Sequence, residues 1–308
     1  MPFRVLSTLR DGWEQVMKLV HFFRSPEWRA RVSARVGKKL LGLARRTPKK
    51  SPVLIAGLQR SGTTMLMDIF HLHPEADVYD EARSSRTFQD FRIRSLDALR
   101  QGVDASHFQF PCFKVIADSH LVPAMMNRLS NPSALWMYRE PGPNAASRLK
   151  KFGQATAAIR AVCDGKSGGG WFAEGVSETA ARRLRGLDRS RFTDFDYACL
   201  VWWVRNQLYF ELGLANDPRV RLLRYERLVV DPESTMRSLC WFIGMRFSSP
   251  TMRFVHAQSL HRANLPVADP QVAALCGELL QRLDREHGRQ WARELVRREA
   301  PVELSLAC

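Results

Sequence analysis

The hydrophobic positions after residue 50 form short apolar runs that alternate with longer segments of helical periodicity. The short runs predict strands at Pro52–Gly57, Ala76–Tyr79, Cys112–Ile116, Ala134–Tyr138 and Val220–Tyr225. The longer segments predict helices at Thr63–Leu72, Ser119–Leu129, Asn144–Phe152, Asp194–Leu214, Pro232–Ile243 and Pro270–His287. This alternation is typical of a three-layer α/β fold, in which a parallel sheet of about five strands has helices on both faces.

Residues 1–50 differ from the rest of the chain in both pattern and charge. Apolar residues recur there every three or four positions, which predicts two helices in a separate N-terminal extension before a domain at 51–308. The net charge of the chain is +16, and these 50 residues carry +10 of it. We expect the extension to pack on the body or to contact an anionic membrane surface through residues 1–45.

Composition narrows the classes of protein that this chain can represent. With 308 residues, 45% of them hydrophobic, the chain can bury a substantial core. The sequence contains no stretch of 18 apolar residues, so it predicts no transmembrane helix. The six cysteines form no CxxC pair, which predicts a reduced, cytoplasmic protein, and we expect no metal site. The body carries only +6 and lacks interleaved basic and aromatic residues, so nucleic-acid binding is a weak alternative.

A phosphate-binding loop follows the first predicted strand. Gly57-Leu-Gln-Arg-Ser-Gly62-Thr63-Thr64 has the G-x-x-x-x-G spacing of a P-loop and lies between a strand and a helix. Backbone N–H groups in such a loop converge on phosphate oxygens, and the positive end of the helix dipole adds to the attraction. Thr63 stands where nucleotide triphosphatases have lysine, and the cation is instead Arg60. A P-loop kinase is therefore an alternative that this substitution disfavours.

The segment PVLIAGLQRSGTTML resembles the 5′-phosphosulfate loop of sulfotransferases that use 3′-phosphoadenosine 5′-phosphosulfate (PAPS). Arg139, which ends a strand, and Ser147, eight residues later, resemble the 3′-phosphate site of that family. The resemblance implies a P-loop-like parallel sheet, PAPS as co-substrate and 3′-phosphoadenosine 5′-phosphate (PAP) as product. Its implied cofactor residues are Arg60, Ser61, Gly62, Thr63, Thr64, Arg139 and Ser147.

Two later segments match the same family. Arg224-Tyr225-Glu226 resembles its strand-end motif, which implies that Tyr225 lies near the adenine. Ser259-Leu-His-Arg262 occupies the place of a cofactor-closing loop in the family, which implies that Ser259 and Arg262 bind the cofactor. The four segments occur in the family's order over roughly residues 50–265.

Sulfuryl transfer requires cations at the transferring group and a base for the acceptor proton. The resemblance assigns the cations to Arg60 and Lys114. The resemblance also implies that the base is Glu81, which follows Arg60 by 21 residues, a spacing similar to that in carbohydrate and tyrosyl-protein sulfotransferases. Cytosolic aryl sulfotransferases use a histidine at a position that is Ile116 here. A surface carboxylate at Glu81, paired with a nearby arginine, is the alternative.

The acceptor is less clear from the sequence. We expect a hydroxyl or amine of a carbohydrate, a glycolipid or another small molecule. Trp171 and Phe172 lie in a glycine-rich segment, Asp164–Gly175, that predicts a mobile loop. They are predicted to stack on an acceptor or to pack back onto the body.

Overall fold

The structure is a computed structural model that describes residues 49–83, 85–153, 156–166, 170–249, 251, 255 and 265–299. The predicted N-terminal extension lies outside these residues, apart from its last two positions. Its helices, its membrane contact and the domain boundary at residue 50 therefore stay predictions.

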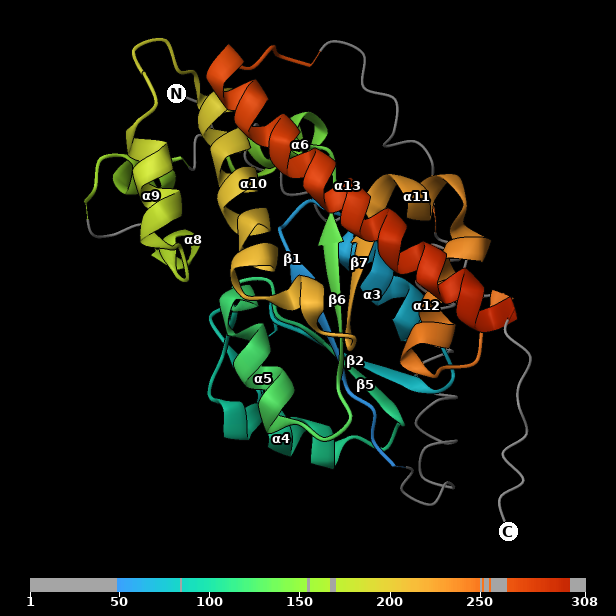
Figure 1. The fold of residues 1–308 in the computed structure, drawn as a ribbon. Helices are drawn as coiled ribbons and strands as arrows, with labels where there is room; N and C mark the ends of the chain where they lie inside the picture. The colour runs from blue at the N-terminus through green and yellow to red at the C-terminus, as the bar shows by residue number, and fades with distance from the viewer. Residues whose placement is uncertain are drawn as a thin grey trace, which may run out of the picture.

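Five parallel strands form the central sheet, in the order β2-β5-β1-β6-β7 (Figure 1). The strands are β1 (Val53–Gly57), β2 (Ala76–Asp80), β5 (Phe110–Lys114), β6 (Ser133–Tyr138) and β7 (Val220–Arg224). All five have the same direction, so their carboxyl ends share one edge of the sheet. The predicted fold class is confirmed.

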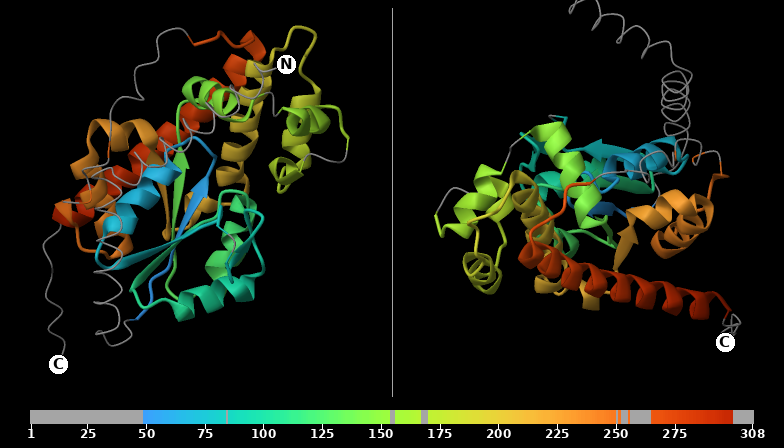
Figure 2. Two further views of the ribbon diagram at one scale, coloured as in Figure 1. Left: turned by 180° about the vertical axis from the view of Figure 1, so that it is seen from behind. Right: turned by 90° about the horizontal axis from the view of Figure 1, so that it is seen from above.

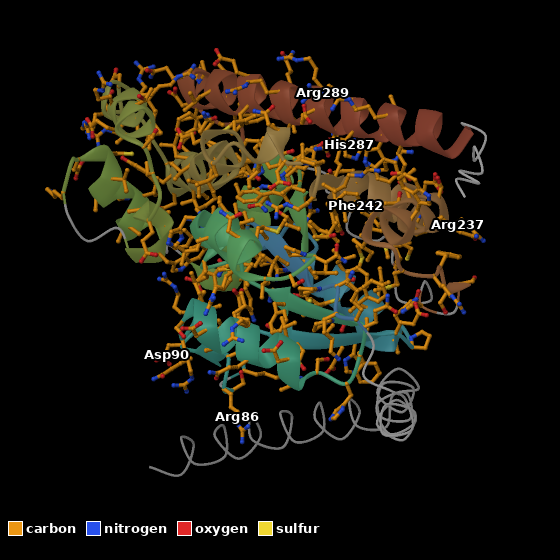
Figure 3. All side chains as sticks on the ribbon, turned by 60° about the horizontal axis from the view of Figure 1, so that its bottom comes forward. Arg86, Asp90, Arg237, Phe242, His287 and Arg289 are labelled. Atoms are coloured by element: carbon orange, nitrogen blue, oxygen red, sulfur yellow. The ribbon has the colours of Figure 1, made fainter. Side chains whose placement is uncertain are left out.

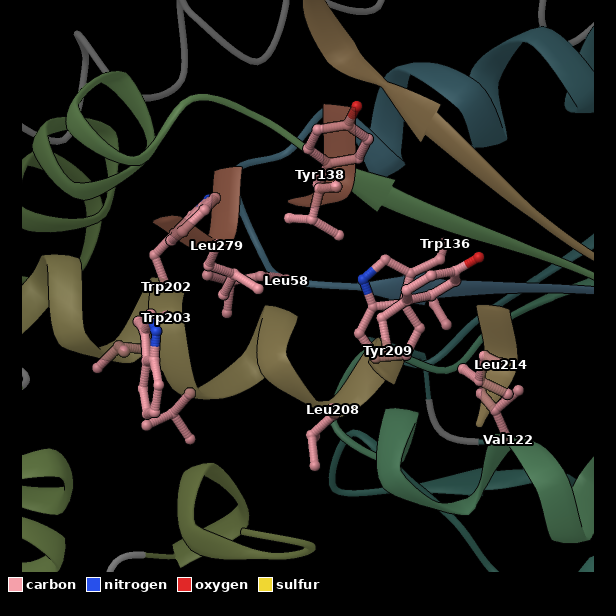
Figure 4. Close-up of a cluster of buried hydrophobic side chains, with 14 of the residues drawn as sticks. Leu58, Val122, Trp136, Tyr138, Trp202, Trp203, Leu208, Tyr209, Leu214 and Leu279 are labelled. Atoms are coloured by element: carbon pink, nitrogen blue, oxygen red, sulfur yellow. The ribbon is translucent and has the colours of Figure 1, made fainter. Parts of the chain in front are cut away.

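Side chains alternate between the two faces of this sheet, and each face has its own hydrophobic core. Leu54 and Ala56 of β1 belong to the larger core, whereas Val53 and Ile55 belong to the smaller one. Helices α10 (Asp194–Glu211), α13 (Pro270–Glu299), α5 (Val122–Arg128) and α4 (Leu96–Ala105) cover the larger core, part of which Figure 4 shows. Helices α3 (Thr63–Leu72) and α12 (Pro232–Ile243) cover the smaller core.

Local sequence signals fix the ends of several helices. Thr193 and Asp196 form a capping box at the start of α10. Asp231 caps α12, whose first residue is Pro232, and Gly244 ends this helix with a φ of 74°. These signals place both helices where the periodicity predicts them.

The structure differs from the sequence prediction at several elements. The last helix continues to Glu299 and runs across the molecule (Figure 2), in contact with α10 and β7. Part of the predicted loop at Asp164–Gly175 is a short helix, α8 (Gly170–Ala173). The sequence prediction omitted β3 (Phe88–Gln89), β4 (Arg92–Ile93), α4, α7 (Ala157–Cys163), α9 (Glu178–Arg185) and α11 (Tyr225–Val230). The predicted start of the helix at Asn144 is extended back to Pro141 in α6 (Pro141–Phe152).

Charged side chains cover the outer surface (Figure 3). Arg86 and Asp90 project from the segment between β2 and α4, and Arg237 and Arg289 project from α12 and α13. Within the part of the chain that the structure describes, no helix combines the length and the apolar character needed to span a membrane.

Candidate active site

The loop between β1 and α3 turns sharply and requires left-handed backbone at three positions. Gly57, Arg60 and Gly62 have φ values of 119°, 68° and 88°. A Cβ atom on Gly57 would lie 2.2 Å from the Met137 carbonyl oxygen, and one on Gly62 would lie 2.4 Å from Cδ2 of Tyr225. Both glycines are therefore required by backbone conformation and by close approach. Arg60 holds the same conformation without that freedom, which is a local strain typical of functional loops.

The amino end of α3 presents backbone donors that its own residues do not use. Gly62 is the N-cap and provides no side-chain cap, and the first turn contains no acidic residue. The first N–H groups of a helix have no partner within the helix, and the dipole makes this end positive. The start of α3, at Thr63 and Thr64, is thus suited to a phosphate or sulfate group.

Two buried polar side chains hold this loop in place, and the sequence pattern predicts neither. Asn144 Nδ2 donates to the Gln59 carbonyl oxygen and to Ser61 Oγ, both at 3.0 Å. Ser119 Oγ accepts from the Gly57 N–H at 3.3 Å and lies 3.1 Å from the Gly57 carbonyl oxygen. The position of Asn144 in the helix after Arg139 is the one available signal, whereas nothing local to Ser119 indicates its role.

The predicted 3′-phosphate residues lie together beside the loop. Arg60 Nε donates to Ser147 Oγ at 3.0 Å, and Arg139 Nη1 lies 3.4 Å from the Arg60 carbonyl oxygen. The Arg139 guanidinium stacks on the ring of Tyr225, 4.5 Å from its centroid, and its Nε lies 3.9 Å from a Glu226 carboxylate oxygen. The structure therefore brings residues from the loop after β1, from the end of β6, from α6 and from α11 to one polar site.

Glu81 and Lys114 lie at the carboxyl ends of β2 and β5. Lys114 Nζ is 3.9 Å from Glu81 Oε1 and 3.4 Å from Asp80 Oδ1. Glu81 Oε2 accepts from the Ala117 N–H at 3.2 Å. The side chain of Glu81 is 4% exposed, so the alternative of a surface carboxylate paired with an arginine is wrong.

The environment of Glu81 favours the neutral form of its carboxyl group more than water favours that of an exposed glutamate. Burial raises the pKa of Glu81 to about 7, although the Lys114 cation and the Ala117 N–H oppose this shift. A carboxyl group with a pKa near neutrality can exchange a proton under physiological conditions, as a general base requires.

A network of charged side chains joins the segment after Lys114 to α8. The Asp118 carboxylate accepts from Arg92 Nε at 2.5 Å and from the Ile93 N–H at 2.7 Å. Arg92 also binds Glu174 through two nitrogens, at 3.0 and 2.6 Å, and Glu174 lies 3.2 Å from His120 Nε2. Asp118 directly follows Ala117, whose N–H donates to Glu81, so this network joins α8 to the backbone beside the proposed base.

Trp171 and Phe172, predicted either to stack on an acceptor or to pack on the body, pack against the larger core. Trp171 and Phe172 stack on each other at 3.9 Å. The guanidinium of Arg205, a fully buried residue of α10, lies 5.0 Å from the Trp171 ring centroid. Ser259 and Arg262 lie outside the described residues, so their predicted part in cofactor binding stays a prediction. Among the residues that the structure describes, no group of three or more His, Cys, Asp or Glu side chains could hold a metal ion.

Comparison with known proteins identifies the family. Residues 50–262 match the sulfotransferase domain family. No curated protein matches the sequence. Similar solved structures include a sulfotransferase from Alicyclobacillus acidocaldarius, with 18% identity, a TM-score of 0.41, and coverage of 80% of this chain and 96% of that one. The sulfotransferase domain from the curacin biosynthetic pathway has 15% identity and a TM-score of 0.43, with 75% and 97% coverage. Mouse sulfotransferase SULT7A1, complexed with PAP, has 11% identity and a TM-score of 0.39, with 80% and 85% coverage.

The chain belongs to the sulfotransferase domain family and is a sulfotransferase, an enzyme of the class that takes a sulfuryl group from PAPS. The residues present fit that cofactor. Gly57 and Gly62 put no Cβ atom at the two left-handed positions where the loop approaches its neighbours closely. The first turn of α3 offers unused donors, and guanidinium groups lie beside them.

Replacement of Gly62 tests the loop geometry. Gly62→Ala forces a Cβ against the Tyr225 ring at a left-handed position, so we expect a loss of roughly 1–3 kcal/mol of stability and a large loss of PAP affinity. Gly277→Ala is the matched control, because a Cβ on this helical glycine would have no atom within 4 Å, so alanine should be neutral or stabilising there. Urea denaturation and calorimetry with PAP measure both. Equal behaviour of the two variants would contradict the proposed fit.

Proposed function

We propose that this sulfotransferase transfers a sulfuryl group from PAPS to a hydroxyl or amine of a carbohydrate, a glycolipid or another small molecule, with Glu81 as general base. The observation that carries the proposal is the placement of Glu81. It is buried and lies beside the Lys114 cation, with β5 alone between its own strand and the strand of the phosphate loop. Its pKa of about 7 suits proton abstraction near neutral pH.

The cofactor residues divide between two phosphate positions in this proposal. The N–H groups of the loop from Arg60 to Thr64 would bind the 5′-phosphosulfate at the start of α3. Arg139 and Ser147 would bind the 3′-phosphate, and Tyr225 would lie near the adenine. Support comes from the contacts among Arg60, Ser147 and Arg139, which gather donors where the family motifs imply phosphate oxygens.

PAPS supplies an activated sulfuryl group and leaves as PAP. In the transfer, Glu81 takes the proton of the acceptor hydroxyl as the acceptor oxygen bonds to sulfur. The bond from sulfur to the phosphate oxygen breaks, and its electron pair stays on PAP. Arg60 and Lys114 stabilise the negative charge that develops around sulfur and on the leaving oxygen. The Ala117 N–H, 3.2 Å from Glu81 Oε2, keeps the carboxylate in position.

The type of base supports the proposed acceptor class. Glu81 corresponds to the base of carbohydrate and tyrosyl-protein sulfotransferases, and Ile116 replaces the histidine of the aryl type. The basic segment at residues 1–45, which lies outside the described residues, is proposed to contact an anionic membrane and so to favour a lipid-linked acceptor.

Thermal stabilisation by nucleotides tests cofactor use. PAP carries the 3′-phosphate that Arg139 and Ser147 are proposed to bind, so we expect millimolar PAP to raise Tm by several degrees. ATP with Mg²⁺ lacks that group, and Thr63 replaces the P-loop lysine, so its shift should be much smaller. A larger shift with ATP, together with ATP turnover, would instead support a P-loop kinase.

The pH dependence of transfer tests the base. Glu81 must be deprotonated to act, so kcat/KM should rise with pH through about 7 and level off above it. Glu81→Gln should lower kcat by about 10²–10⁴-fold and abolish the rise of kcat/KM with pH, while PAP still binds. Lys114→Met removes the cation that lowers the pKa of Glu81. The rise of kcat/KM with pH should therefore occur at higher pH in this variant.

Both variants are compared with the wild type on one acceptor found by screening sugars, glycolipids and phenols. Full activity of Glu81→Gln would exclude Glu81 as the base.

A further inference from the structure

Arg148 is a buried cation beside the phosphate loop that the proposed function does not use. It lies in α6 directly after Ser147 and is 4% exposed. Its Nη1 donates to the side-chain oxygen of Gln59 at 3.0 Å, whereas its Nε is buried without a hydrogen-bond partner in the described residues. Gln59 is the loop residue immediately before Arg60.

The charge of Arg148 has no acidic partner among the residues that the structure describes. Burial lowers the pKa of Arg148 to about 10, and repulsion from Arg60 adds to this shift. Burial also lowers the pKa of Arg205 to about 10. In contrast to Arg148, however, Arg205 has the carboxylates of Glu174 and Asp118 nearby, which partly compensate its charge. A buried cation next to a second cation is costly for a folded protein unless an anion compensates both.

The guanidinium of Arg148 also contacts α8. It lies 5.0 Å from the ring centroid of Phe172, which stacks on Trp171, whose ring in turn lies 5.0 Å from the guanidinium of Arg205. Arg205 Nη1 donates to the carbonyl oxygens of Trp171 and Glu174, both at 3.1 Å.

These contacts connect the phosphate loop to the backbone at Ala117, which donates a hydrogen bond to Glu81. Glu174 binds Arg92, and Arg92 binds Asp118, the residue after Ala117. The path therefore runs from Gln59 through α8 to the backbone that donates to Glu81.

We propose that Arg148 is a positioning residue for the cofactor and for α8. The anion bound at the phosphate loop compensates the charges of Arg60 and Arg148. Arg148 then holds Gln59 and Phe172 more firmly, so cofactor binding orders the acceptor side. This inference rests on the proposed use of PAPS. It explains why a buried arginine is retained with no acidic partner in the described part of the chain.

Arg148→Met separates this role from a structural one. Methionine keeps the length and the contact with Phe172 but removes the charge, so the ligand-free variant should have a Tm equal to or above that of the wild type. Its affinity for PAP should fall on the order of tenfold in calorimetry, because a nearby compensating charge is lost. Arg148→Lys retains the charge and should bind PAP more tightly than the methionine variant.

Hydrogen–deuterium exchange on the full chain tests the connection to α8. PAP should slow exchange at residues 170–176 in the wild type but not in Arg148→Met at saturating PAP. Arg160→Met is the matched control. Arg160 also stacks on an aromatic ring, at 3.7 Å from Tyr197, but pairs with Asp194 at 2.9 Å, so PAP affinity and exchange at α8 should be unchanged.

The outcomes distinguish the inference from the proposed function. A lower ligand-free Tm with unchanged PAP affinity in Arg148→Met would show that Arg148 is structural and would overturn the inference alone. Equal protection of residues 170–176 by PAP in the wild type and in Arg148→Met would overturn it as well. Absence of PAP binding to the wild type would overturn the proposed function and, with it, the inference.

Discussion

Positive charge concentrated at one sharp turn is the constraint on which the rest of this site depends. The loop after β1 requires left-handed backbone at Gly57, Arg60 and Gly62. Arg139 and Arg148, which follow β6, contact the residues of this loop. Arg139 and Arg148 are 5% and 4% exposed, so water screens them poorly. In the proposed function, a polyanionic cofactor would compensate these charges. The fold tolerates the arrangement because well-packed cores lie on both faces of the sheet.

The strand order separates the two tasks of the enzyme. Strands β1, β6 and β7 carry the loop, Arg139 and the segment of Tyr225, which form the proposed cofactor site. Strands β5 and β2, on the other side of β1, carry Lys114 and Glu81. The acceptor proton would therefore be removed on one side of the loop while the leaving phosphate is held at the loop itself. The transferring group would lie between them.

The sequence predicts the sheet and the turn between β1 and α3 well, because both depend on local signals. Short apolar runs mark the five strands, and a glycine spacing marks the turn into α3. The sequence does not predict what supports the loop. Asn144 contacts Ser61 and Gln59, which lie 83 and 85 positions earlier in the sequence. Ser119 contacts Gly57, which lies 62 positions earlier. No local pattern reveals such distant contacts. Similarly, the surroundings of Glu81 become visible only when β2 and β5 are paired.

The segment Asp164–Gly175 shows a second limit of prediction from the sequence. The glycine-rich composition of Asp164–Gly175 predicts a loop, but Trp171 and Phe172 provide enough packing against Arg205 and Arg148 to hold a short helix there. Propensity is a weak signal where tertiary contacts oppose it.

A structure of the PAP complex tests the central claim most directly. The account predicts the 5′-phosphate on the N–H groups at the start of α3 and the 3′-phosphate within hydrogen-bond distance of Arg139 and Ser147. PAP bound elsewhere, or with its 3′-phosphate away from these two side chains, would contradict the account.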